Sequence, residues 1–410
     1  LFDDISAILS ARDTDPDVGV DGVSDTDDFR ALRLADMAAT VRDDGRTGVL
    51  SVDQVIVGND TEEALLDAVL ESVSFRWAED EPEDGAEPFV LDMDGLTVMG
   101  LKTDQMDEAM PQGAGVVGSL MAGAIANLSP AGEPPYRQVD LGKLSVASSL
   151  FDLTTDGFEA DTQKQGQVIT LRAVMEPMLL TIKDLSGTPL AAHMDVLRDN
   201  GLDEISFKGS STTTFDQKED RVTFVDNGTE IDEGLRMRCN YAVQGLAASA
   251  EALEASGAKP PVFELGDSEE DAQVIMERYM ADAEAFSAAQ AEANSLIKLE
   301  GLTCIVQDVA DNSLVDRGYA VASAITGSPV SVLKGGAKTM IALSSLTAQS
   351  EFQRDLMDTV GSGVIDFIDQ PGQTMTINID PDSPVSITSL TGENGEEPSI
   401  KPLNLNVQVQ

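Results

Sequence analysis

Short alternations of apolar and polar residues dominate the chain and predict antiparallel strands. Apolar positions lie on both sides of a glycine turn at 43–46, which is typical of a β-hairpin. Alternation predicts two faces for the second strand of this hairpin, with Leu50, Val52 and Ile56 on one and Ser51, Asp53 and Val55 on the other. Further strands are expected at 72–77 and 89–101.

Strand patterns resume between 136 and 183 and become most regular after residue 201. A short helix at 189–198 is expected to end at Asn200-Gly201, since glycine after the last turn is a common helix stop. The following strands are predicted at 202–207, 211–215, 221–225 and 235–243. Turns at 217–220 and at Asn227-Gly228 would connect them into a β-meander.

Helical spacing is confined to a few segments. Thr61 can cap a helix near 61–70, and amphipathic stripes predict long helices near 268–299 and 346–368. The uncharged stretch 114–128 carries small residues four apart and is about fifteen residues long, short of the roughly 20 that cross a bilayer. We therefore expect it to be a helix buried against a sheet. The segments 302–306, 318–325 and 330–333 have strand patterns.

Together these patterns predict an α+β fold, predominantly antiparallel β, in which curved meander sheets carry a few long amphipathic helices. A chain of 410 residues exceeds what one core usually organises, so two or three domains are expected. The expected divisions are an acidic N-terminal segment (1–28), a β-rich module (29–184), a β-meander module (185–258) and a helix-strand module (259–410).

The last eight residues, 403–410, alternate without a single charged side chain. A strand of this kind is a free pairing edge unless it is covered. The favoured interpretation is that it closes its own sheet. The alternative is that it pairs with the edge of a neighbouring subunit, by β-augmentation.

Charge changes the picture of partners and surroundings. The chain has 73 acidic and 26 basic residues, a formal net charge of −47. Phosphate-rich partners are repelled by such a field, so nucleic acid and direct contact with an anionic membrane are excluded. Acidic surfaces suit a salty medium, and the chain begins at Leu1 rather than Met, which suggests removal of an export or anchor segment. We expect a periplasmic or extracellular protein of a marine Gram-negative bacterium.

Aspartates recur between residues 13 and 28, and four of them, Asp13, Asp15, Asp17 and Asp21, are the candidate metal ligands. Closely spaced carboxylates can converge on Ca²⁺. The spacing departs from an EF-hand, because Val18 stands where glycine is needed and Ser24 where the final glutamate is needed. A solvated acidic loop is the favoured interpretation, and Ca²⁺ is the one cofactor that the sequence suggests.

Two cysteines, Cys239 and Cys304, both lie in strand-like runs and are a disulfide candidate. Two buried free thiols would give the same pattern, and both interpretations stay open. Neither cysteine lies in a CxxC motif or beside a histidine, which disfavours metal binding and redox catalysis.

Catalytic residue types are scarce. His193 is the single histidine, and the run Gly335-Gly336-Ala337-Lys338-Thr339 lacks the first glycine of a phosphate-binding loop. Aromatic residues make up 4% of the chain, few for the stacking platforms of sugar-cleaving enzymes. We therefore expect no catalytic site.

The run Gly201-Leu-Asp-Glu-Ile-Ser-Phe207, followed by aspartate-rich turns and a long strand, resembles the β-rich periplasmic proteins of the AsmA-like kind. The segment 367–384 resembles the C-terminal parts of uncharacterised exported proteins of alphaproteobacteria. The resemblance implies a role in outer-membrane homeostasis and lipid handling, and it assigns no functional residues.

The sequence thus favours a non-enzymatic, exported structural or binding protein of the bacterial envelope. Its expected partners are an envelope protein, its own copies, or a lipid or another hydrophobic ligand held in a groove. The alternative is a self-assembling surface or appendage subunit, joined by β-augmentation and cations.

Overall fold

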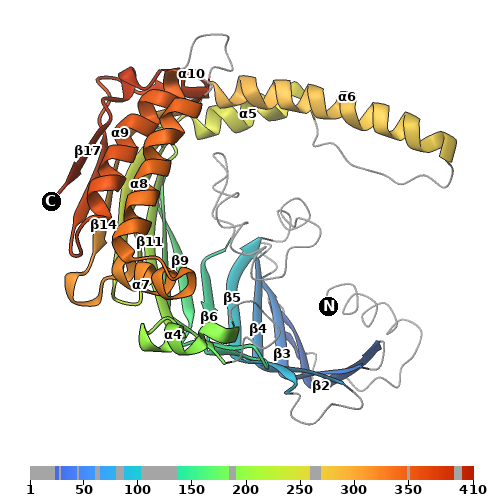
Figure 1. The fold of residues 1–410 in the computed structure, drawn as a ribbon. Coiled ribbons are helices and arrows are strands. Elements are labelled where there is room, and N and C mark those ends of the chain that lie inside the picture. Colours follow the sequence, from blue (N-terminus) through green and yellow to red (C-terminus); the bar gives the residue numbers. More distant parts are fainter. Residues whose placement is uncertain are drawn as a thin grey trace.

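A single antiparallel sheet organises the protein. The computed structural model describes residues 24–26, 29–43, 46–60, 65–79, 87–102, 136–183, 191–258, 269–348, 351–391 and 399–410. In this part of the chain, 17 strands form one sheet, and Figure 1 shows it curving from the strands around β14 on one side to β2 on the other. The α+β class with predominant antiparallel β is confirmed.

The N-terminal strands form a meander in which each strand pairs with the next. They are β1 (Ser24–Thr26), β2 (Phe29–Asp43), β3 (Arg46–Asp60), β4 (Leu65–Glu79) and β5 (Phe89–Lys102). The hairpin predicted around the turn at 43–46 is confirmed, as are the strands at 72–77 and 89–101.

Short strands follow β5 in pairs. One half of β5 pairs with β6, and the other half pairs with β7. Next in the sheet, β6 pairs with β9 and β7 pairs with β8. Both β8 and β9 then pair with the long strand β10. These strands are β6 (Gln138–Leu141), β7 (Leu144–Ala147), β8 (Phe151–Thr155), β9 (Phe158–Gln165) and β10 (Val168–Ile182).

A second series of antiparallel pairs completes the sheet from β10 to the last strand, with helices in several of its connections. Its strands are β11 (Glu204–Asp216), β12 (Arg221–Ile231), β13 (Leu235–Gln244), β14 (Lys298–Asp308), β15 (Thr374–Ile379), β16 (Val385–Ser386) and β17 (Asn406–Val409). β17 pairs with β15, so the prediction that the C-terminal strand closes its own sheet is confirmed.

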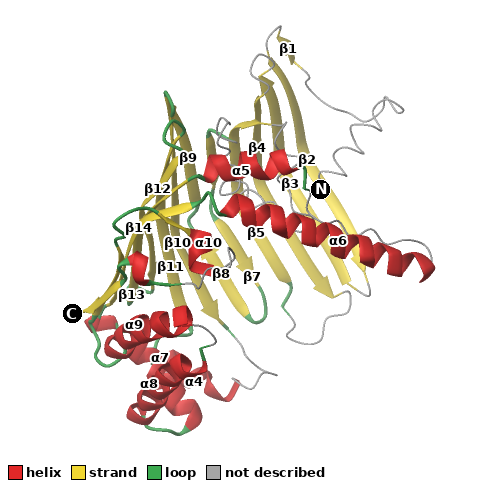
Figure 2. Cartoon of the chain, turned by 90° about the horizontal axis from the view of Figure 1, so that it is seen from above, coloured by secondary structure: helices red, strands yellow, loops and turns green. Residues whose placement is uncertain are grey.

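Helices interrupt the second half of the chain. They are η2 (Ala191–His193), α4 (Met194–Asp199), α5 (Leu246–Ser256), α6 (Glu269–Asn294), η3 (Ala310–Asn312), α7 (Leu314–Thr326), α8 (Val330–Thr347), α9 (Glu351–Phe367), α10 (Ile387–Thr391) and η4 (Lys401–Leu403). Figure 2 shows α5 and α6 crossing over the strands and α7–α9 gathered on the C-terminal side.

Three predicted elements have to be corrected. The helix near 61–70 is wrong, because residues 65–70 belong to β4, where pairing with β3 and β5 outweighs the local helical spacing. The strands at 318–325 and 330–333 are also wrong, since these residues lie in α7 and α8. The helix expected near 268–299 exists as α6 but ends at Asn294, and residues 298–299 belong to β14. The helix expected near 346–368 exists as α9, after residues 346–347 at the end of α8. The segment 114–128 lies outside the described residues.

The meander after residue 201 is confirmed, but with longer strands than predicted. β11 runs through both predicted strands 202–207 and 211–215, and β12 passes through Asn227-Gly228 without turning. Asp226 has a φ of 52° there, and the register with β13 shifts between Phe224 and Asn227. The Asn-Gly signal therefore marks a β-bulge in this protein.

Such irregularities are aligned across the sheet and form what we call the crease. Asp36 in β2 and Ser72 in β4 have positive φ angles, of 53° and 51°. Asp94 of β5 lies opposite Ser72, and its N–H bonds to Lys143 O, between β6 and β7, at 2.8 Å. Farther along, the register of β10 with β11 shifts between Met175 and Met178. A bend in the same row of many strands curves the whole sheet.

The crease also reverses the alternation of side chains. Met93 and Leu96 are three residues apart in β5 and would lie on opposite faces of a regular strand. Both nevertheless pack into one cluster with Val139. Val52 and Val55 are likewise three residues apart and both buried. Val55 therefore lies on the same face as Leu50 and Val52. The prediction that placed Ile56 on that face, and Val55 on the other, is wrong.

One continuous apolar face results, which we call the inner face. Its residues Ile169, Phe215 and Val222 pack against Leu246 and Ala247 of α5. Figures 1 and 2 show α5 and α6 over the side toward which the sheet curves, so the inner face is concave. The opposite, outer face carries ion pairs such as Lys208 with Glu230 at 3.1 Å.

Candidate ligand-binding face

The crease divides the inner face into two halves that differ in burial. On one side, which we call the core half, Phe215 and Val222 are 0% exposed, and Val139 and Ile169 are buried as well. Tyr136 covers this half near β6, and α5 covers it near β12. The core half is therefore an ordinary hydrophobic core.

On the other side of the crease, which we call the open half, most apolar side chains are only half-buried. Among its large side chains, Val52 is buried, and Val52 adjoins the crease. The residues of the open half are Met37, Ala39, Val41, Gly48, Leu50, Val52, Val73, Phe75, Trp77, Phe89, Leu91, Met93, Leu144, Val146, Phe151, Leu153, Thr155, Met178, Leu180, Ile182, Ile205 and Phe207.

The strand register places these side chains in straight rows. One row crosses eight strands and consists of Ala39, Leu50, Phe75, Leu91, Val146, Leu153, Leu180 and Ile205. The next row, one residue along each strand, faces outward and consists of Ala38, Ser51, Ser74, Asp92, Ser145, Thr154, Leu179 and Ser206. Adjacent positions thus differ sharply in polarity, which is the signature of a sheet with one apolar face.

Aromatic rings cluster at one end of the open half. Phe75 stacks on Trp77 with ring centroids 6.1 Å apart, and Phe89 meets Phe75 edge-on at 6.4 Å. The Trp77 ring lies over Gly48, where it leaves no room for a Cβ. Glycine is therefore required at this position for the large ring to lie flat along the sheet.

Among the described residues, charged side chains flank the open half at the ends of its strands. Lys183, directly after β10, bonds to Asp152 at 2.8 Å and to Glu87 at 3.2 Å, and Asp152 faces outward because its neighbours Phe151 and Leu153 face inward. These two hydrogen bonds raise the pKa of Lys183 above the ordinary value of a lysine. Arg46 pairs with Glu79 at 3.3 Å beside the aromatic cluster. The apolar rows between these ion pairs carry no charged side chain.

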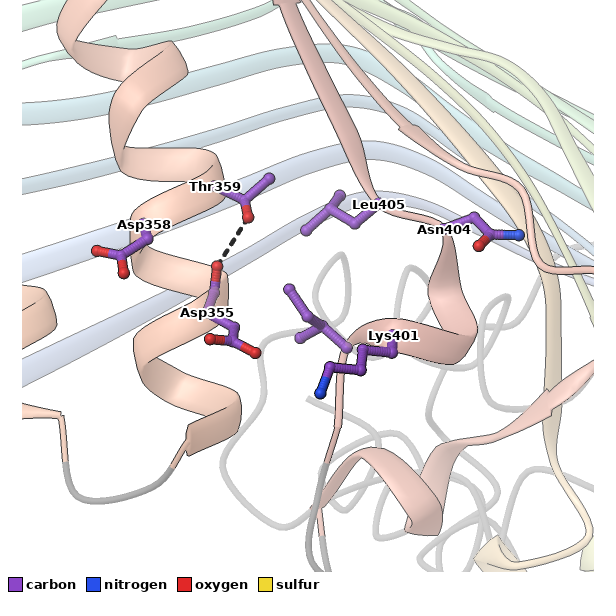
Figure 3. A pocket seen from close by; sticks show the side chains of 7 residues that line it. Asp355, Asp358, Thr359, Lys401, Asn404 and Leu405 are labelled. Carbon is purple, nitrogen blue, oxygen red and sulfur yellow. Dashed lines mark hydrogen bonds between the residues drawn. The ribbon is translucent and has the colours of Figure 1, made fainter.

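A second concavity lies between α9 and η4. It has a volume of about 320 Å³ and is lined by polar groups of Asp355, Asp358 and Lys401 together with Ile400 and Leu405 (Figure 3). The Thr359 hydroxyl donates to the carbonyl of Asp355 at 2.8 Å within the helix. Lys401 is largely exposed, so this pocket has a solvated wall and offers little to fix a ligand.

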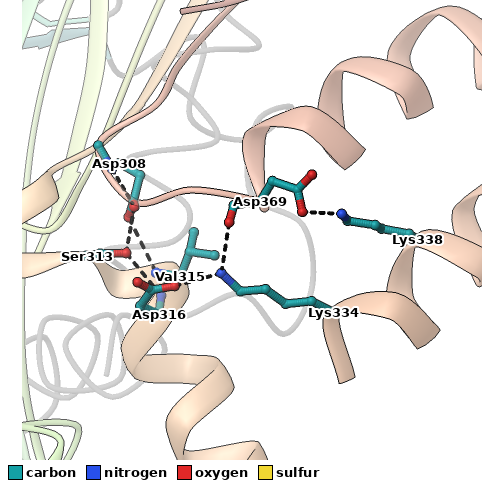
Figure 4. A network of polar contacts seen from close by, with 8 residues as sticks. Asp308, Ser313, Val315, Asp316, Lys334, Lys338 and Asp369 are labelled. Carbon is teal, nitrogen blue, oxygen red and sulfur yellow. Dashed lines mark hydrogen bonds and ion pairs between the residues drawn. The ribbon is translucent and has the colours of Figure 1, made fainter. Parts of the chain in front are cut away.

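Among the described residues, Asp308 is the most buried carboxylate, and it serves the packing of helices. It is 1% exposed, accepts a hydrogen bond from Ser313 Oγ at 2.6 Å, and Ser313 in turn caps α7 through Asp316 N at 3.0 Å (Figure 4). Lys334 of α8 reaches Asp316 at 2.8 Å. This network joins the end of β14 to α7 and α8 and has a structural role.

The disulfide candidate is confirmed. Cys239 and Cys304 face each other across β13 and β14, with Cα atoms 4.1 Å apart, and they form a disulfide. A structural disulfide indicates an oxidising compartment. The register that brings the two residues together could not be derived from their separation in the sequence.

The candidate metal ligands Asp13, Asp15, Asp17 and Asp21 lie outside the described residues. Within the described ranges, no group of His, Cys, Asp and Glu residues has the arrangement of a metal site. None of the helices in this part of the chain has the length and apolar character needed to cross a membrane.

Sequence reasoning missed the open half itself. The individual strands were visible as alternations, but the half-buried state of their apolar side chains depends on which elements cover them. The reversal at the crease also hid the continuity of the face, although the aspartates and serines in the middle of otherwise apolar strands were a usable signal.

Comparisons with known proteins support no further assignment. A family model described as "Uncharacterized protein" matches residues 240–410, from β13 to the C-terminus. No curated protein matches the chain.

Proposed function

We propose that this chain is a non-enzymatic, exported protein of the bacterial envelope that binds the hydrocarbon part of a lipid-like ligand on the open half of its inner face. The observation that carries this proposal is the contrast in burial across the crease. The same strands build a filled core on one side and a half-buried apolar surface on the other. A contiguous apolar surface that stays partly accessible is a candidate binding site.

The dimensions of the open half suit a long alkyl chain. Its central row crosses eight strands, and a strand spacing of about 4.8 Å gives a length of about 34 Å. A lipid chain spans roughly 15 Å, half the hydrocarbon thickness of a bilayer. Each methylene buried there would contribute about 0.8 kcal/mol.

Two independent features support the proposed compartment. The disulfide between Cys239 and Cys304 is typical of oxidising compartments, and the net charge of −47 suits a salty exterior. Both favour the periplasm or the outside of a marine Gram-negative cell. The resemblance of residues 201–207 to AsmA-like proteins agrees with lipid handling in the envelope.

A matched pair of variants tests the proposal. Leu180 and Leu179 are neighbours in β10, both half-buried, but Leu180 lies on the inner face and Leu179 on the outer face. Binding would be measured by displacement of an environment-sensitive alkyl dye from the full chain. We expect Leu180→Gln to weaken binding about tenfold and Leu179→Gln to leave it within about twofold.

Organic extraction of the natively purified protein, followed by mass spectrometry, would show the bound ligand directly. Failure to recover any acyl or other long-chain molecule, together with equal dye binding by both variants, would refute the proposal.

A second function, assembly through β17, is supported by the edge of the sheet. Thr374 and Gln410 exchange both backbone hydrogen bonds, at 2.8 and 3.0 Å, so the alternate residues Val407 and Val409 direct their backbone groups away from β15. A neighbouring subunit could pair with this edge, with cations screening the acidic surfaces.

Gln408→Lys would place a charge on the edge strand, whereas Gln307→Lys would place it on the central strand β14, on the same outer face. Light scattering at increasing protein concentration should show loss of assembly for the first variant alone. A full-length protein that stays monomeric at high concentration and high calcium would rule this function out.

A further inference from the structure

We infer that the partner at the free edge of β17 is a second copy of this chain, and that the two copies pair their β17 strands antiparallel about a two-fold axis. This inference rests on the assembly function proposed above and adds the partner and the symmetry. A two-fold contact uses the same surface on both subunits and closes after two copies, whereas a head-to-tail contact generates a filament. The assembly is therefore a dimer in which one copy continues the sheet of the other.

The backbone of β17 specifies a strand as the partner. β17 pairs with β15 on one side, and Figure 1 shows it at the margin of the sheet. Gln410 exchanges both backbone hydrogen bonds with Thr374, at 2.8 and 3.0 Å. Since alternate residues of a strand direct these groups to opposite sides, the N–H and C=O groups of Val407 and Val409 point away from β15. Another strand supplies donors and acceptors at the spacing that these groups need.

The register follows from the symmetry. An axis through Gln408 lets Val407 of each copy exchange both backbone hydrogen bonds with Val409 of the other copy. Gln408 then lies directly opposite Gln408 of the second copy, and Asn406 lies opposite Gln410. This register uses every outward-facing backbone group of β17.

The outer face beside this edge is uncharged, so two acidic copies can approach each other there. Three rows cross β14, β15 and β17 on this face, and their residues are Gln307, Thr374 and Gln410, then Ile305, Thr376 and Gln408, then Thr303, Asn378 and Asn406. Continued into β13, two of these rows reach Arg236 and Arg238. Three strand spacings of about 4.8 Å place β13 about 14 Å from β17, beyond the Debye length of about 8 Å at physiological salt.

The dimer leaves both ligand-binding faces free. Antiparallel strands that are related by a two-fold axis have that axis perpendicular to the sheet, so the two inner faces lie on the same side. The open half begins at β2, at the other end of the sheet from β17. The two open halves therefore lie at the two far ends of the dimer.

Single cysteine variants of the full chain test the register. The chain has two cysteines and they are joined in a disulfide, so an added cysteine is the one free thiol. Gln408→Cys would face its own copy with Cα atoms about 4.5 Å apart, within the range of a disulfide. Asn406→Cys is the matched control, because it is equally exposed on the same face but lies four residues, or about 14 Å, from its own copy. Under mild oxidation we expect Gln408→Cys to form cross-linked dimers at least about tenfold faster than Asn406→Cys.

Opposite charges at position 408 test the symmetry. Gln408→Lys and Gln408→Glu each place like charges directly opposite one another across the axis, which weakens pairing, whereas an equal mixture places lysine opposite glutamate. Light scattering should show each variant alone as a monomer at concentrations where the wild type has twice the monomer mass. The mixture should regain the doubled mass. Added sodium chloride should strengthen the wild-type dimer, because it screens the repulsion between two chains of net charge −47.

The outcomes separate this inference from the assembly function. A wild-type mass that doubles and then stays constant with concentration, together with preferential cross-linking at position 408, supports the two-fold dimer. A mass that keeps growing, or equal cross-linking of the two cysteine variants, would overturn the inference and leave assembly through β17 standing. A wild-type protein that stays monomeric at high concentration and high salt would overturn both.

Discussion

The core half and the open half of the inner face are built from the same strands and from the same residue types, yet they differ in burial. β11 shows the difference within one strand: Phe215 is 0% exposed, whereas Phe207, on the same face beyond the crease, is half-buried. Residue type therefore does not decide which half is filled. The covering elements do, since Tyr136 and α5 contribute side chains to the core half.

This comparison teaches that an apolar sheet face is a core only where another layer covers it. An ordinary domain buries such a face completely, because uncovered apolar surface weakens folding and promotes aggregation. Here the rows of the open half keep their apolar character across eight strands without a comparable layer among the described helices that pack on the sheet. The described helix–strand contacts are concentrated on β15–β17, at the far end.

The largest expected effect is on folding and separates the two halves. Phe215→Ala should lower the free energy of unfolding by about 5 kcal/mol, because the ring is fully enclosed and its loss leaves a cavity. Phe207→Ala should cost about 1 to 2 kcal/mol, since part of the ring is already in water. Equilibrium denaturation in urea would measure both values.

Equal destabilisation by the two substitutions would show that the open half is filled in solution. The distinction between the halves, and with it the proposed ligand site, would then be lost.

Much of the fold was accessible from the sequence because period-two alternation is a local signal. The hairpin of β2 and β3, the strands β4 and β5 and the meander from β11 to β13 were all indicated by it. The helices α7 and α8 were missed, since short apolar runs such as Gly318 to Ile325 fit a strand as well as a helix.

The site was less accessible, for two physical reasons. Asp36 and Ser72 reverse the alternation within their strands, so apolar residues on the two sides of the crease have opposite parity in the sequence but share a face. Burial is moreover a property of contacts between distant segments, and α5 is nearly eighty residues away from the Ile169 that it helps to cover. Neither feature leaves a local pattern.

The disulfide offers a way to test whether the two ends of the sheet act independently. It closes a loop across a sequence separation of 65, and the chain-entropy model gives a stabilisation of about 4 kcal/mol. The double variant Cys239→Ala with Cys304→Ala should therefore unfold at lower urea concentrations. Dye binding to the open half, measured where the variant is still folded, should stay within about twofold of the wild type.

A folded double variant that no longer binds the dye would show that the geometry of the open half depends on β13 and β14. The open half would then be one part of a larger site that includes the C-terminal strands.

The smallest effect concerns the pH dependence of the core half. Burial raises the pKa of Tyr136 from 10.0 to about 12. Above pH 10 the unfolded state loses the tyrosine proton first, so the folded state loses up to about 2 to 3 kcal/mol of relative stability as the pH rises toward 12. Tyr136→Phe removes this titration while keeping the ring that covers Val139. Urea denaturation of both proteins between pH 9 and about 12 should therefore show that the variant gains stability relative to the wild type as the pH rises. A difference that stays constant with pH would mean that the hydroxyl is in water and that Tyr136 does not seal the core half.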